Sequence, residues 1–274
     1  MKEQLKYWYR KYIPIKFRDL ISLKLIREFI NDIFNGYKFN NFNKFIQLNA
    51  RNGGISYYAS NDDDEATLDN DLVYKICQWG AKAYEIKLEA NPNLPGAHFY
   101  NQYPGEHYRL LAAITILEKP DSIIDIGTYT GMSSRVFLDY GNENTKVSTF
   151  DLVHWTEFDS YLDESDFNKK RITQELGNLS DENIFKLHED LFSKSSLIFL
   201  DAPKDGYFEE KLIRQLSKIN FQERNRYLIL DDIRVPEMFE VWRMIDSPKI
   251  DATTFGHWSG TGIVNISQGL KIKK

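Results

Sequence analysis

Two stretches of the chain carry residues whose types and spacing could do chemistry. One contains an apolar run, an acid and a glycine turn, Ile123-Ile124-Asp125-Ile126-Gly127-Thr128-Tyr129-Thr130-Gly131-Met132-Ser133. The other has Asp201 and Lys204, followed thirty residues later by Asp231 and Asp232. Glycines let a ligand approach the backbone closely. Carboxylate oxygens bind hard divalent cations, and a nearby lysine can act as a base. These residues predict a nucleoside cofactor beside a divalent metal.

The spacing after the glycine turn supports a nucleoside ligand. Asp151 ends the next apolar run about twenty residues later, where a carboxylate can accept hydrogen bonds from both ribose hydroxyls. The turn from Gly127 to Gly131 matches neither the Gly-x-Gly-x-x-Gly pattern of dinucleotide sites nor the Gly-Lys-Ser/Thr of phosphate loops. The alternative interpretation is a tight turn without a ligand.

The carboxylates and the lysine also have ordinary structural explanations. Asp201 and Lys204 could form an ion pair at a strand end, which contributes about 0–1 kcal/mol. Asp231 and Asp232 could instead favour the N-terminus of a following helix. The histidines show no local spacing typical of zinc or non-haem iron ligands, so we expect no iron site; they are His98, His107, His154, His188 and His257. Of these, only His257 is expected near the pocket.

Alternating strand-like and helical segments position these residues. Apolar runs predict strands near residues 122–126, 146–150, 184–188, 196–200 and 226–230. Helical periodicity predicts helices near residues 106–117, 132–140, 166–176, 207–218 and 236–245. Segments 253–255 and 262–266 suggest a closing hairpin. The alternation predicts an α/β fold with a doubly wound, mostly parallel sheet that binds ligands beyond its carboxyl strand ends.

From Tyr103 to Lys274 the chain resembles the cation-dependent, S-adenosylmethionine-dependent class I O-methyltransferases, which include the catechol and caffeoyl-CoA enzymes. The most specific match is to the family's Asp-Ala-x-Lys-Asp-x-Tyr segment, here Asp201-Ala202-Pro203-Lys204-Asp205-Gly206-Tyr207. The glycine turn and Gly260-Thr261-Gly262-Ile263-Val264 are also similar to family segments. The resemblance implies a Rossmann-like sheet of seven strands whose last strand runs antiparallel.

The resemblance also implies roles for single residues. S-adenosylmethionine would be held by Glu106, Asp125, Gly127, Thr128, Tyr129, Gly131, Ser133, Asp151 and Asp190, the last in the loop after the third strand. Asp201, Asp231 and Asp232 would ligate Mg²⁺ or Mn²⁺. Lys204 would be the catalytic base, with a pKa lowered by the cation and by burial. The chain departs from the family at Asp232, where the family has Asn, and at Pro203.

The first part of the chain differs from the rest. We expect residues 1–95 to form a mainly helical N-terminal extension and residues 96–274 to form the methyltransferase domain. The basic segment 1–27 and the apolar positions up to Phe34 suit a helix packed on the main domain or on a second copy, as in a homodimer. Peripheral contact with an anionic membrane stays open. A further helix is predicted over residues 68–90, with Cys77 in the core.

Composition narrows the functional classes. The net charge of −5 does not favour nucleic-acid binding. No apolar run approaches the ~20 residues that span a bilayer, and one cysteine cannot form an intramolecular disulfide, so we expect a cytoplasmic protein. The leading hypothesis is an O-methyltransferase of a small hydroxylated acceptor, either a sugar or glycan intermediate or a catechol-like diol. Alternatives are a metal-independent methyltransferase, another reaction on this fold, or a non-catalytic binding module that works through the N-terminal region.

Overall fold

The computed structural model describes residues 69–221 and 225–273. Within these ranges seven strands form one sheet in the order β3-β2-β1-β4-β5-β7-β6. Their bounds are β1 Ser122–Ile126, β2 Lys146–Asp151, β3 Ile172–Leu176, β4 Leu197–Leu200, β5 Tyr227–Asp231, β6 Lys249–Asp251 and β7 Thr261–Asn265. The five strands β1 to β5 pair with one another in parallel, whereas β7 is antiparallel to both β5 and β6. The predicted doubly wound sheet with an antiparallel last strand is confirmed.

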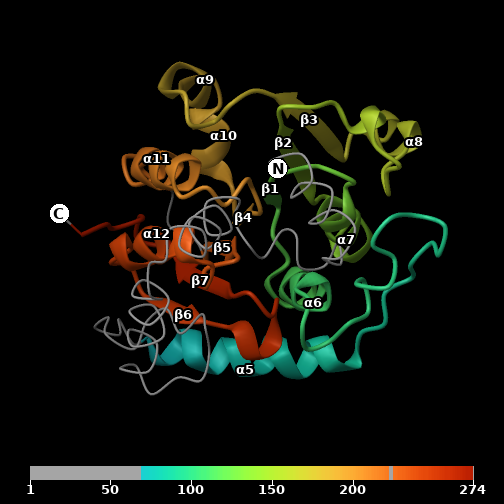
Figure 1. Ribbon diagram of the computed structural model, residues 1–274, viewed down its shortest axis with the longest axis horizontal. Helices are drawn as coiled ribbons and strands as arrows, with labels where there is room; N and C mark the ends of the chain where they lie inside the picture. Colours follow the sequence, from blue (N-terminus) through green and yellow to red (C-terminus); the bar gives the residue numbers. More distant parts are fainter. Residues whose placement is uncertain (1–68, 222–224, 274) are drawn as a thin grey trace, which may run out of the picture. The chain divides into compact units, whose positions relative to one another are not determined.

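Helices cover both faces of this sheet (Figure 1). Their bounds are α5 Asn70–Glu85, α6 Tyr108–Glu118, α7 Met132–Tyr140, α8 Glu164–Asn168, α9 Glu182–Leu187, α10 Glu189–Lys194, α11 Tyr207–Leu216 and α12 Phe239–Met244. In β4, Leu197 and Phe199 join the core beneath α5, α6 and α7, while Ile198 and Leu200 join the core beneath α9 to α12. Strand side chains alternate between faces, so one apolar run fills both cores.

The segment after β2 differs from the prediction. The helix predicted over 166–176 is the short α8 followed by β3, and the strand predicted over 184–188 lies in α9. Ile172 pairs with Val147 of β2, which places β3 at the sheet edge. Asp181 caps α9 by accepting a hydrogen bond from the Asn183 amide at 2.8 Å. Short apolar runs do not distinguish strand from helix, and here pairing and capping decide.

The chain closes with a hairpin that is shifted relative to the prediction. Residues 253–255 form a single 3₁₀ turn rather than a strand. The strand that pairs with β7 is β6, which lies immediately before that turn. Strand β7 also pairs with β5 in the register Asp231↔Thr261, so the loop between β6 and β7 ends beside the carboxyl end of β5. This pairing places residues 256–260 at the functional edge of the sheet.

Helix α5 packs into the main core. Its buried side chains lie on one stripe, Leu72, Ile76, Trp79 and Ala83. Trp79 donates a hydrogen bond to Glu118 of α6 at 3.0 Å and its ring meets that of Tyr227 edge-on at 5.1 Å. Cys77 lies off this stripe and is exposed, so its predicted core position is wrong. None of the described helices is long and apolar enough to cross a bilayer.

Two expectations for the N-terminal region are left as predictions. The basic segment 1–27 and the apolar positions up to Phe34 lie outside the described residues. The helix predicted over 68–90 is present as α5, with Asp69 as its N-cap. The expected boundary between residues 95 and 96 therefore falls after a helix that shares its core with the sheet.

Candidate active site

The carboxyl ends of β1, β2, β4 and β5 meet at one edge of the sheet, because these strands are parallel. A pocket of about 670 Å³ lies at this edge. Its lining includes Gly127 and Tyr129 after β1, Asp151 at the end of β2, and Asp201 and Lys204 after β4. The glycine turn and the Asp201 segment, predicted separately, thus border one cavity. Its volume lies within the range typical of small-ligand and cofactor sites.

The glycine turn is held close to the neighbouring strand end. Gly127 has a φ of +104°, and a Cβ there would lie 1.9 Å from the Asp201 carbonyl oxygen, so no other residue fits. The Asp151 carboxylate accepts hydrogen bonds from the Tyr129 amide at 2.8 Å and from the Leu152 amide at 2.7 Å. Oδ1 also accepts from the Val153 amide at 3.2 Å, whereas among the described residues Oδ2 accepts only from Tyr129 and keeps a further lone pair. Asp151 can therefore fix the turn and still accept hydrogen bonds from a ligand.

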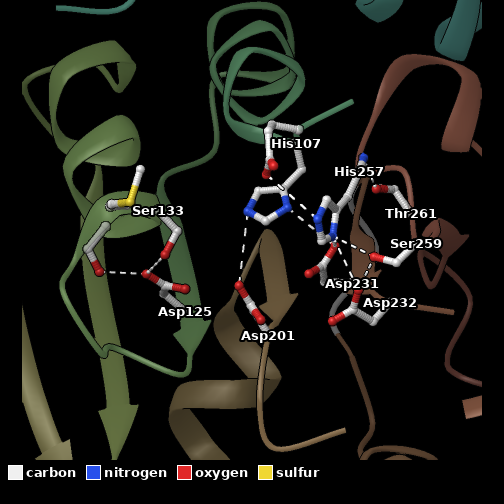
Figure 2. Close-up of polar contacts among 12 residues, drawn as sticks. His107, Asp125, Ser133, Asp201, Asp231, Asp232, His257, Ser259 and Thr261 are labelled. Carbon is white, nitrogen blue, oxygen red and sulfur yellow. Dashed lines mark hydrogen bonds and ion pairs between the residues drawn. The ribbon is translucent and has the colours of Figure 1, made fainter. Parts of the chain in front are cut away.

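Asp125 supports the turn from behind rather than lining the pocket. Its carboxyl group is fully buried and accepts hydrogen bonds from Ser133 at 2.8 Å and Ser134 at 2.5 Å (Figure 2). These bonds tie the first turn of α7 to β1. Burial raises the pKa of Asp125 to about 7, although the two serine hydroxyls oppose the shift. Among the predicted cofactor residues, Asp125 and Ser133 thus have a positioning role in this arrangement.

The other predicted cofactor residues lie in different surroundings. Thr128 is buried and its hydroxyl is 2.8 Å from that of Thr149, while Gly131 packs against Leu162. Glu106 faces His257 instead of the pocket. None of these three is among the residues that border the cavity.

The placement of Asp190 in a loop after the third strand is wrong. Asp190 lies in α10, is exposed, and pairs with Lys194 at 2.5 Å. The error follows from the misplaced strand, because β3 ends at Leu176. The residues after β3 that do border the pocket include Asn178 and Leu179, which sequence reasoning missed. A correct assignment of β3 would have identified them.

Lys204 lies among the three predicted metal ligands. Its Nζ contacts the Asp201 carboxylate and lies 3.0 Å from Asp232 Oδ2 and 3.7 Å from Asp231 Oδ2. Burial alone would lower the pKa of Lys204, but the three carboxylates outweigh it and raise that pKa well above its usual value. The predicted lowering of this pKa depends on a bound cation and stays a prediction. A loss of negative charge from the cluster would lower the pKa of Lys204.

Two histidines join the cluster, although no local spacing along the chain indicates them. His107 and His257 are 150 residues apart. They meet because the backbone of Gly105 bonds to the 256–258 loop, donating to the Gly256 carbonyl at 3.0 Å and accepting from the Trp258 amide at 3.1 Å. His107, Asp231 and His257 offer ligand atoms within 4.8 Å of one another, an arrangement that no local spacing predicts; the expectation of no iron site stays a prediction.

The histidines share Asp231. His107 Nδ1 lies 3.3 Å and His257 Nδ1 lies 3.2 Å from Asp231 Oδ1. His257 Nδ1 is also 3.2 Å from Asp232 and 2.8 Å from the Ser259 hydroxyl. Burial would raise the pKa of Asp231, but the charges of His257 and His107 hold it well below its usual value. Burial would lower the pKa of His257, but Asp231 and Asp232 raise it to about 11.

The cluster contains three carboxylates and one lysine. Asp201, Asp231 and Asp232 face Lys204, so the cluster carries net negative charge unless a histidine is protonated or a cation binds. Carboxylate and imidazole groups are common ligands of divalent metals. The donor set therefore fits a divalent cation.

No protein-family model and no curated protein sequence matches the chain. Its fold is similar to that of a methyltransferase from Geobacter sulfurreducens, with 15% sequence identity over 77% of this chain and 100% of the other, and a TM-score of 0.44. It is similar to the SAH-bound methyltransferase PaMTH1 of Podospora anserina, at 14% identity, 86% and 98% coverage, and a TM-score of 0.42. It is also similar to an O-methyltransferase of Bacillus cereus in complex with SAH, with 13% sequence identity over 76% of this chain and 93% of the other, and a TM-score of 0.39.

Proposed function

We propose that the protein is an S-adenosylmethionine-dependent O-methyltransferase that acts on a small hydroxylated acceptor with help from a divalent cation. The observation that carries this proposal is the continuity of the pocket. Its lining runs from the glycine turn and Asp151, suited to a nucleoside, to Asp201 and Lys204, suited to a cation and a proton transfer. The same residues carry the sequence resemblance to the cation-dependent O-methyltransferases.

The residues have distinct roles in this proposal. Asp151 accepts hydrogen bonds from the ribose hydroxyls, and the Gly127 backbone lets the cofactor approach the strand end. The acceptor oxygen attacks the methyl carbon in line with the carbon–sulfur bond, which breaks as the new carbon–oxygen bond forms. S-adenosylhomocysteine leaves, and neutral Lys204 takes the hydroxyl proton. A bound cation would favour the neutral lysine, because it offsets the carboxylate charges that raise the pKa of Lys204. A bound cation would supply Lewis-acid chemistry that lowers the pKa of the acceptor hydroxyl.

The acceptor class follows from the donor set and its surroundings. Two oxygens on adjacent carbons can chelate one cation, which favours a sugar diol or a catechol-like diol. Aromatic side chains stand beside the cluster and the turn: Tyr129 and Phe158 meet edge-on at 5.0 Å, and Trp258 adjoins His257. Tyr129 and Trp258 are exposed, so they are available to contact an acceptor.

The test separates cofactor binding from turnover. We expect calorimetry to detect S-adenosylmethionine binding to the full-length protein and to lose it in Asp151→Ala. Lys204→Ala and Asp231→Asn should abolish methyl transfer to a panel of diols and sugars while leaving cofactor binding within about threefold. Lys186→Ala, which changes an exposed lysine of α9, is the matched control.

Two results would contradict this proposal. Absence of S-adenosylmethionine binding in the presence or absence of added cation would remove its foundation. Full turnover in both Lys204→Ala and Asp231→Asn would exclude the proposed base and cluster. Turnover that survives exhaustive chelation would favour the metal-independent methyltransferase instead.

A further inference from the structure

His107 is a buried polar residue without a satisfied partner. Its side chain is 3% exposed, and among the described residues neither ring nitrogen has a hydrogen-bond partner. Figure 2 shows the ring between Asp201 and His257. Its Nδ1 faces Asp231 at 3.3 Å and its Nε2 faces Asp201 at 4.0 Å. A buried polar group that lacks a partner is costly, so this ring requires an explanation.

The spacing of the ligand atoms suits a metal ion. With metal–ligand bonds of ~2.1 Å, neighbouring ligands on one ion lie roughly 3.0–3.4 Å apart. Asp231 Oδ1 lies 3.3 Å from His107 Nδ1 and 3.2 Å from His257 Nδ1, within that range. The contact of His107 with Asp231 is not a hydrogen bond, whereas an ion needs only the ligand atoms to face a common point.

The second ring is oriented in the same sense. His257 presents Nδ1 to Asp231 and has the Glu106 carboxylate on its other side, with Oε2 3.7 Å from Nε2. Histidine ligands commonly direct their second ring nitrogen at a carboxylate, which fixes the ring and raises its basicity. The Gly105 backbone bonds to the 256–258 loop hold the two histidines at this separation.

We propose that His107, His257 and Asp231 form a mixed nitrogen and oxygen site for Fe²⁺, Co²⁺ or Zn²⁺ in preference to Mg²⁺. Imidazole nitrogen suits these transition metals, whereas Mg²⁺ favours carboxylate, carbonyl and water oxygens. The inference deepens the proposed function, on which it rests for the role of the ion. It replaces the all-carboxylate set of Asp201, Asp231 and Asp232 by one in which two ligands come from the N-cap of α6 and from the loop before β7.

The experiment titrates chelator-treated, full-length protein with Co²⁺ and, in parallel, with Mg²⁺. Calorimetry gives both affinities, and the visible absorption of Co²⁺ reports its ligands. We expect Co²⁺ to bind at least ~100-fold more tightly than Mg²⁺. Because carboxylates alone also favour Co²⁺, the deciding samples are His107→Asn and His257→Asn. Each should weaken Co²⁺ at least ~10-fold and change its absorption, while the Mg²⁺ affinity stays within about threefold.

Controls keep the result decisive. His98→Asn changes an exposed histidine and should leave both metals unaffected. Circular dichroism and thermal unfolding check each variant, and His257, which is 17% exposed, decides the matter if the His107 variant does not fold. Unchanged Co²⁺ affinity and absorption in His257→Asn, with loss of binding in Asp231→Asn, would overturn the proposal in favour of an all-carboxylate site.

S-adenosylmethionine binding is measured on the same samples, so the two proposals fail separately. Cofactor binding with histidine-independent Co²⁺ binding overturns only the mixed-ligand site. Histidine-dependent Co²⁺ binding without any cofactor binding supports the metal site and overturns the methyltransferase proposal.

Discussion

Asp125 gives the protein a pH-dependent stability that a single substitution can isolate. Its pKa is about 7 in the folded chain against a usual 3.8, so between these values the unfolded chain has released a proton that the folded chain keeps. The stabilisation is therefore complete below about pH 4 and is lost as the pH rises toward 7. Asn has no proton to lose and can still accept from Ser133. We expect the Tm of Asp125→Asn, relative to the unsubstituted protein, to rise from pH 4 to pH 7.

Calorimetric scans at several pH values measure this difference. Glu143→Gln, which changes an exposed carboxylate, is the matched control. A constant difference between Asp125→Asn and the unsubstituted protein would show that the Asp125 carboxyl group titrates alike in the folded and unfolded chains.

Single residues also mark the limit of what the sequence predicts about the site. Asp201, Lys204 and Asp231 could be identified because each follows an apolar strand and because parallel strand ends meet at one edge. His107 could not be identified, since it meets His257 only through backbone pairing of two loops. The raised pKa of Lys204 in the cluster could not be identified either, since it depends on three carboxylates from two strand ends.

At the scale of elements, the turn after β1 should tolerate no side chain at Gly127. Gly127 and Gly269 both have positive φ, of +104° and +89°, but a Cβ at Gly269 meets nothing within 4 Å. Gly269→Ala should therefore lower the free energy of unfolding only by the cost of backbone strain, about 1–3 kcal/mol. Gly127→Ala should lower the free energy of unfolding by at least about 1–3 kcal/mol more, because its Cβ would collide with the Asp201 carbonyl oxygen. Urea unfolding of both variants gives the difference, and equal losses would contradict the close approach.

The elements themselves could be predicted where apolar runs and turns agree. Strands β1, β2, β4 and β5 and helix α7 were predicted within about one residue, because turn-forming residues bound these segments in the sequence. Strand β3 was missed because Ile172 is its only buried residue. An edge strand of this kind is defined by pairing with β2, which no local pattern reveals.

For the whole molecule, the position of α5 predicts where a stable chain must begin. Trp79 has no exposed surface, and it contacts both Glu118 and Tyr227. We expect a chain of residues 58–274 to unfold cooperatively, because it keeps α5, and residues 96–274 to be insoluble or to unfold without cooperativity. Trp79→Ala in the full chain should lower the free energy of unfolding by about 3–5 kcal/mol. Tyr84→Ala, on the exposed face of α5, should lower it by under about 0.5 kcal/mol.

Circular dichroism and urea unfolding of the two truncated chains check this expectation. A cooperatively folded 96–274 chain would place α5 outside the stable domain and support the boundary expected from the sequence. Without α5, the apolar face shared with α6 would be exposed to water.

Asp201 borders the pocket and also faces His107 and Lys204, so one carboxylate belongs to both the pocket and the cluster of charged side chains. If the proposed cofactor and cation both bind, their binding free energies are linked through this shared charge. A sulfonium and a divalent ion would compete for it, whereas the uncharged sulfur of S-adenosylhomocysteine would not. We expect the bound ion to weaken the binding of S-adenosylmethionine more than the binding of S-adenosylhomocysteine. S-adenosylmethionine should in turn weaken the binding of the ion by the same factor. Calorimetric titrations in both orders measure the two factors; identical effects on substrate and product would show that the shared carboxylate does not couple them.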